Sequence, residues 1–66
     1  MSKTNTQIIQ ALKENQEGLS LRDIATMLDR WYESILENIH QLESLNLITK
    51  RETVKGASSC YMYYIK

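Results

Sequence analysis

The segment ATMLDRWYESILENIHQLESLNLI, residues 25–48, limits the possible folds more than any other part of the chain. Its apolar residues fall at helical spacing on either side of a short polar break. They are Ala25 and Leu28 before the break, and Ile35, Ile39 and Leu42 after it. Asn46 then stands where a helix would end in the left-handed conformation, which Asn tolerates better than most residues. The segment therefore predicts the order helix, turn, helix, strand.

Three further places in the chain carry residues that are typical of the start of a helix. Thr4 and Gln7 have the spacing of a capping box, in which each side chain satisfies a free backbone donor near the other residue. Ser20 and Asp23 form a second such pair, and Asp29 is expected to cap the third helix. The three helices are expected over residues 4–15, 20–29 and 30–45.

The pattern from residue 47 onward is that of strands rather than helices. It predicts a β-hairpin over residues 47–65 with its turn at residues 55–58. The second strand is apolar on both faces, which places Cys60, Met62 and Tyr64 on one side and Tyr61, Tyr63 and Ile65 on the other. One face must pack on the helices, and the other needs a partner or forms a tyrosine-lined surface. Candidates for a homodimer interface are Tyr61, Tyr63 and Leu36.

A chain of 66 residues forms one small domain and has no room for a large enclosed active site. Eight Lys and Arg balance eight Asp and Glu, so only the distribution of charge can indicate a partner. Cys60 is the only cysteine, which suits the cytoplasm and excludes a disulfide scaffold. No apolar run is long enough to cross a membrane, and the first residues lack the apolar core of a signal peptide.

Catalytic and metal-binding groups are also missing from the pattern. His40 and Cys60 have no third group to complete a nucleophilic site, and one His with one Cys falls short of the three or four ligands that zinc takes. We therefore expect neither an enzyme nor a protein with a metal or another cofactor.

The predicted elements together resemble the winged-helix DNA-binding domains of small prokaryotic and viral transcription regulators, such as the MarR-like and ArsR-like groups. The resemblance covers nearly the whole chain as a single domain, residues 1–66. It is most specific in the apolar spacing from Ala25 to Ile48 and in the tail GASSCYMYYIK, which is similar to the family's wing. It implies an α+β fold of three helices followed by a two-stranded antiparallel β-hairpin, the wing.

The resemblance further implies that the third helix enters the major groove of double-stranded DNA while the wing holds the backbone. The matching positions on the third helix are Tyr32, Ser34, Glu37, Asn38 and Gln41. Basic residues of the wing and of the second helix region that can contact phosphates are Arg22, Arg30, Lys50, Arg51 and Lys55. The implied function is transcription regulation, for which a homodimer on two half-sites is the natural form in so small a protein.

The third helix departs from the family's pattern in its charge. It carries Glu33, Glu37 and Glu43, with no Lys or Arg between Trp31 and Asn46. Three carboxylates beside phosphates cost electrostatic energy, although a carboxylate can accept a hydrogen bond from cytosine. The alternative is a winged-helix protein-interaction module without DNA binding, which holds a basic protein partner through the acidic helix and the tyrosine-rich last strand.

Two further features of the third helix have more than one interpretation. Tyr32, Leu36 and His40 are spaced by four and form a stripe beside the core face. This stripe can meet thymine methyl groups and phosphate, or a protein. Trp31 is expected to cover the core beside the neighbouring apolar residues, with an exposed contact as the alternative.

Overall fold

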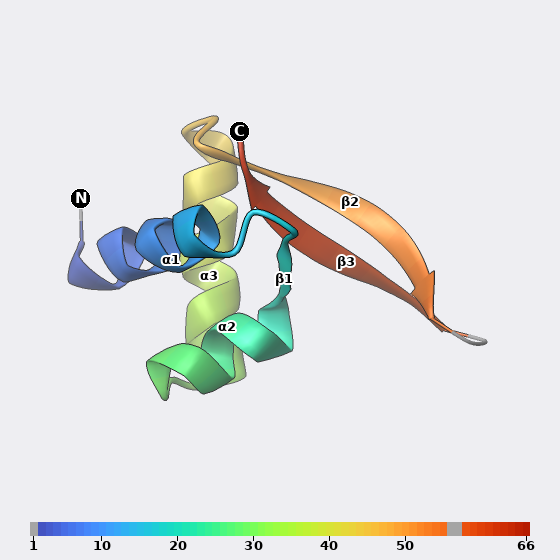
Figure 1. Cartoon of the computed structure of the whole chain (residues 1–66). Helices are drawn as coiled ribbons and strands as arrows, with labels where there is room; N and C mark the ends of the chain where they lie inside the picture. The colour runs from blue at the N-terminus through green and yellow to red at the C-terminus, as the bar shows by residue number, and fades with distance from the viewer. Residues whose placement is uncertain (1, 56–57) are drawn as a thin grey trace.

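The computed structural model describes residues 2–55 and 58–66, and within them the backbone forms three helices and three strands. These are α1 (Lys3–Glu14), β1 (Leu19–Ser20), α2 (Leu21–Leu28), α3 (Tyr32–Ser44), β2 (Ile48–Lys55) and β3 (Ser58–Ile65). The helices gather on one side, and the hairpin of β2 and β3 projects away from them (Figure 1). The predicted tip of the hairpin at residues 56–57 and the side chains of residues 54, 55, 58 and 59 lie outside the described part.

Helix α1 begins earlier than predicted. Its N-cap is Ser2, whose Oγ accepts a hydrogen bond from the backbone N–H of Asn5 at 3.1 Å. The predicted capping box of Thr4 and Gln7 is therefore wrong. Ser and Thr are both good N-caps, so the local pattern alone cannot separate the two starts.

Helix α2 has the predicted capping box at its start. The backbone N–H of Asp23 donates to Ser20 Oγ at 3.1 Å, and the backbone N–H of Ser20 donates to Asp23 Oδ2 at 3.3 Å. At the other end Asp29 has a left-handed φ of 54° and is the C-cap of α2. The prediction that Asp29 caps the third helix is wrong, because the N-cap of α3 is Trp31.

The buried inner face of helix α3 determines how the helix is oriented in the fold. Ile35, Ile39 and Leu42 have no exposed surface, as their spacing predicts. Burial of each such side chain contributes about 1.5–3 kcal/mol, so the helix cannot easily rotate about its axis. Asn46 has a φ of 64°, which confirms the predicted left-handed end after this helix.

The sheet has three strands in the order β1–β3–β2, not the two that the sequence predicts. Strands β2 and β3 pair antiparallel along their whole length. Strand β1 pairs with the other side of β3, with Leu19 opposite Tyr63 and Ser20 opposite Met62. Two residues are too few to give an alternating pattern, so the sequence could not reveal β1.

The turn between α1 and β1 depends on Gly18. Its φ is +97°, a conformation that L side chains rarely adopt, and a Cβ placed on it would lie 2.5 Å from Cε2 of Tyr64. Glycine is therefore required here both by the backbone conformation and by the close approach of β3. This contact joins the α1–β1 turn to the base of the wing.

Candidate nucleic-acid interface

The outer face of α3 carries the residues that the sequence predicts as DNA contacts. Tyr32 is 52% exposed, Ser34, Glu37 and Gln41 are also exposed, and Asn38 is half-buried. Because the inner face is buried in the core, these positions lie around the rest of the helix surface, with Tyr32 toward the wing and Gln41 toward α1. Their accessibility fits contact with a partner of either kind that the sequence suggests.

The two amide side chains on this face are already engaged within the protein. Asn38 Nδ2 donates to the backbone oxygen of Ser34 at 3.0 Å. Gln41 Oε1 accepts from Nδ2 of Asn5, a buried residue of α1, at 2.8 Å. An amide binds adenine through its oxygen and its nitrogen together, so Gln41 would have to give up the bond to α1 first.

Asn5 is a structural residue that the sequence analysis missed. It is the buried polar residue of α1, and its Oδ1 lies buried without a hydrogen-bond partner among the described residues. Its bond to Gln41 joins residues 36 positions apart, so no local pattern could have revealed it. The bond couples α1 to the outer part of α3.

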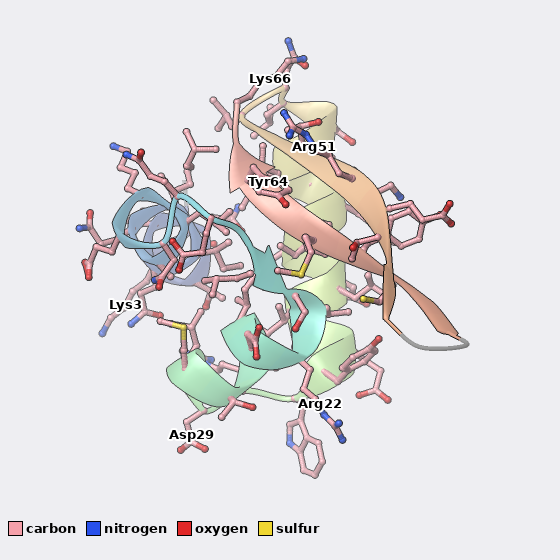
Figure 2. All side chains as sticks on the ribbon, turned by 45° about the vertical axis from the view of Figure 1, so that its right-hand side comes forward. Lys3, Arg22, Asp29, Arg51, Tyr64 and Lys66 are labelled. Carbon is pink, nitrogen blue, oxygen red and sulfur yellow. The ribbon has the colours of Figure 1, made fainter. Side chains whose placement is uncertain are left out.

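Two of the predicted cations flank the start of α3. Arg22 of α2 and Arg30 of the turn are exposed and line one surface hollow of about 680 Å³ together with Trp31 and Tyr32. Arg22 lies at the lower end of the molecule in Figure 2, near the start of α2, and Asp29 lies at the other end of this helix. Two cations and the carboxylate of Asp29 therefore line the hollow at the start of α3.

The predicted wing cations lie on opposite faces of the hairpin. Lys50 lines the groove toward α3, and its Nζ lies 4.7 Å from the ring centroid of Tyr61. Arg51 lies over the ring of Tyr64 at 5.0 Å and lines a separate hollow beside Leu12 of α1. Figure 2 shows Arg51 and Tyr64 together, far from Arg22. Neighbouring strand residues point to opposite faces, which separates these two cations. The side chain of Lys55 lies outside the described part.

A groove of about 730 Å³ separates α3 from the wing. The stripe of Tyr32, Leu36 and His40 lines one wall, and Lys50 and Tyr61 line the other. Tyr61 is 46% exposed, and Leu36 is partly buried against the core. The stripe that the sequence indicates therefore faces the wing across an open groove.

Tyr63 belongs to the core rather than to an exposed interface. Its side chain is 5% exposed, whereas the sequence analysis grouped it with Tyr61 as an interface residue. The two tyrosines share a face of β3, but Tyr63 is opposite Leu19 of β1 and lies closer to the helices. Burial raises the pKa of the Tyr63 hydroxyl, and the negative charge of Glu43 raises it further.

Trp31 is 81% exposed, so the expectation that it covers the core is wrong. Its spacing of four from Ile35 would place it on the core face if it were helical. As the N-cap it has φ −64° and ψ 140°, which is extended backbone, and its side chain therefore leaves the helical track. It also makes no side-chain capping bond, which costs about 0.5–2 kcal/mol relative to Ser or Asp.

The described residues contain no group of three His, Cys, Asp or Glu side chains placed to hold a metal ion. Across residues 2–55 and 58–66, each helix is too short or too polar to span a membrane.

Comparison with known proteins identifies the fold. The model of the HVO_A0114 family matches residues 1–64. A search of curated proteins finds no match. Among solved structures, a mutant of S. aureus MepR, a MarR-family winged-helix regulator, is similar with a TM-score of 0.86 and 20% sequence identity. The match covers 100% of this chain and 48% of that chain, so the chain spans about half the length of MepR. The predicted winged-helix fold is thereby confirmed.

Proposed function

Because this chain belongs to the HVO_A0114 family and folds as a winged helix, we propose that it binds double-stranded DNA and regulates transcription. Helix α3 enters the major groove with its exposed N-terminal half, and the wing contacts the sugar-phosphate backbone. The observation that carries the proposal is the position of Arg22, Arg30 and Lys50, three exposed cations beside the outer face of α3. Cations at the edges of a groove-binding helix can neutralise the phosphates on either side of it.

The acidic residues of α3 affect both the affinity for DNA and the choice of base. Glu33 and Glu37 are exposed on this helix and repel phosphates. A carboxylate can accept a hydrogen bond from N4 of cytosine but cannot pair with the acceptor atoms of guanine. We therefore expect modest affinity and a preference for cytosine opposite Glu37. Ser34, which bonds to either kind of atom, is the other candidate for a base contact.

A chain this small buries little DNA surface alone, so we propose a homodimer on two half-sites. Tyr61 and Leu36, the proposed interface residues, border the groove between α3 and the wing, so the partner subunit and DNA would share this groove. We further propose that the protein acts in the cytoplasm.

The proposal is tested by fluorescence anisotropy of a labelled random-sequence duplex at increasing salt. If about four phosphates are neutralised, the logarithm of the binding constant should fall with the logarithm of salt at a slope of roughly −3 to −4. Absence of binding at low salt would refute the proposal. Selection from a pool of duplexes would then identify the preferred sequence and the spacing of its half-sites.

The groove between α3 and the wing supports a second candidate, a module that docks a basic protein. Its walls combine aromatic and apolar side chains with the cations Arg22 and Lys50, and Glu33 and Glu37 are exposed on the same helix outside the groove lining. These features suit an amphipathic basic segment better than they suit phosphate. Replacement of Glu33 and Glu37 by Lys separates the two candidates, because it should strengthen DNA binding in the first and abolish partner binding in the second.

A further inference from the structure

We infer that the start of α3 is a stacking platform for an unpaired nucleobase. The protein should therefore bind DNA that contains an exposed, unpaired base more tightly than it binds a continuous duplex. The inference rests on the proposed DNA-binding function and specifies the kind of DNA. The platform, as we use the term, consists of the rings of Trp31 and Tyr32.

The platform is exposed to solvent, and the backbone conformation of Trp31 determines where the indole ring points. Trp31 is 81% exposed and Tyr32 is 52% exposed. The carbonyl of Trp31 accepts the first hydrogen bond of α3 from the N–H of Ile35 at 3.1 Å, while its extended backbone turns the indole off the helix. The indole is therefore anchored at its backbone and free at its ring.

Charges around the platform suit a nucleic-acid strand. The hollow that both rings line also contains Arg22 and Arg30 of the α2–α3 region, against the single carboxylate of Asp29. An aromatic ring that stacks on a base, with arginines near the adjoining phosphates, is the usual arrangement in proteins that bind single strands. The platform provides the aromatic rings, and Arg22 and Arg30 beside it provide the positive charge.

The acidic outer face of α3 favours the same kind of DNA. Duplex DNA carries one charge per ~1.7 Å of axis and a single strand one per ~3.4 Å, so Glu33 and Glu37 are repelled less where strands separate. An unpaired base also reaches the platform without insertion of the whole helix into a groove between two rows of phosphates. The carboxylates that weaken duplex binding therefore weaken the binding of a locally opened site less.

The test compares two fluorescently labelled duplexes with G·C-rich ends that differ by one nucleotide, one fully paired and one with a single bulged thymine. Stacking of one base should make the bulged DNA bind between about fivefold and about a hundredfold more tightly. Emission of Trp31, the only tryptophan, should be quenched more by the bulged DNA than by the paired one. Equal affinities for the two DNAs would overturn the inference.

Three variants test whether the platform causes the preference. Trp31→Ala should bind the two DNAs equally, Trp31→Phe should keep part of the preference, and Leu45→Ala should keep all of it. Leu45 is a matched control because it is a large exposed apolar residue at the opposite end of α3. Trp31 and Leu45 are both exposed, so these variants should unfold within a few degrees of the wild type. A preference that survives in Trp31→Ala would overturn the inference.

The outcomes separate this inference from the proposed function. If the paired DNA binds and the bulge adds nothing, the platform fails and the proposed function stands. If neither DNA binds at low salt, both fail. Sedimentation of Trp31→Ala should match the wild type, and a change of oligomeric state would overturn the inference in favour of an interface between protein chains.

Discussion

The two faces of the wing each carry a cation over a tyrosine, but the two pairs have different surroundings. Arg51 over Tyr64 lies on the back face, beside α1, where Tyr64 also approaches Gly18. Lys50 over Tyr61 lies on the inner face, which looks onto the groove and α3. The back pair is thus part of the packing between the wing and the helices, whereas the inner pair borders an open surface.

This difference shows that a residue type does not define its role on a strand. Lys50 and Arg51 are neighbours in the sequence, and both are cations on aromatic rings. Because neighbouring residues of β2 point to opposite faces, Arg51 packs beside the helices, whereas Lys50 lies beside the candidate interface.

Of the variants that test this difference, Gly18→Ala should lower the stability of the protein most, because it disturbs the packing of the back face of the wing. A left-handed conformation costs an L residue about 1–2 kcal/mol, and displacement of the Tyr64 ring adds about 1–3 kcal/mol of overpacking. A domain of this size has only a few kcal/mol of stability, so the variant should be largely unfolded in chemical denaturation.

A double-mutant cycle separates the two causes. In a Tyr64→Ala background the overpacking part of the Gly18→Ala effect should vanish while the backbone part remains. A Gly18→Ala protein as stable as the wild type would refute the close contact at the base of the wing.

Lys50→Ala should weaken duplex binding roughly three- to tenfold at low salt and make the salt slope shallower by about one. Arg51→Ala, which removes the same charge from the back face, should change affinity less than about twofold. Anisotropy titrations of both variants measure this. Equal losses would show that both faces of the wing contact DNA.

Glu33→Gln combined with Glu37→Gln should raise duplex affinity several-fold at low salt, because both carboxylates are exposed on the helix opposite the inner face. The control is Glu14→Gln with Glu17→Gln, which changes the net charge by the same two units in and just after α1. The gain should be larger in α3 and should fade toward physiological salt. Equal gains would mean that net charge, and not the position of α3, determines affinity.

Tyr63→Phe should change the dependence of stability on alkaline pH. Burial raises the pKa of Tyr63 above its ordinary value of 10.0, so the folded state keeps this proton longer than the unfolded state does. The contribution of this hydroxyl is complete below pH 10.0 and is lost as pH rises through the folded-state pKa. Urea unfolding near and above this pH should show a steeper loss for the wild type than for the variant.

Features with a local cause could be predicted from the sequence. The capping box of Ser20 and Asp23, the left-handed Asn46 and the buried face of α3 each follow from the chemistry of nearby residues. Together with the change to strand-like spacing, these features carry the resemblance to winged-helix domains that implies the fold.

The missed features have causes that local patterns do not contain. The pairing of β1 with β3 and the bond of Asn5 to Gln41 join distant residues. Trp31 fits the helical period by position but has extended backbone, so its side chain is exposed instead of buried. Tyr63 is buried and pairs with Leu19 of β1, whereas Tyr61 lies outside that pairing and is exposed.

We propose that the outer face of α3 and the inner face of the wing form one DNA-binding surface. A two-dimensional amide NMR titration of the labelled protein with duplex DNA, at low and at physiological salt, tests it most directly. We expect shifts to cluster on residues 32–41 and on the neighbourhood of Lys50 and Tyr61, and to shrink as salt increases. Shifts confined to α1 and the back of the wing, or no shifts at low salt, would contradict the claim.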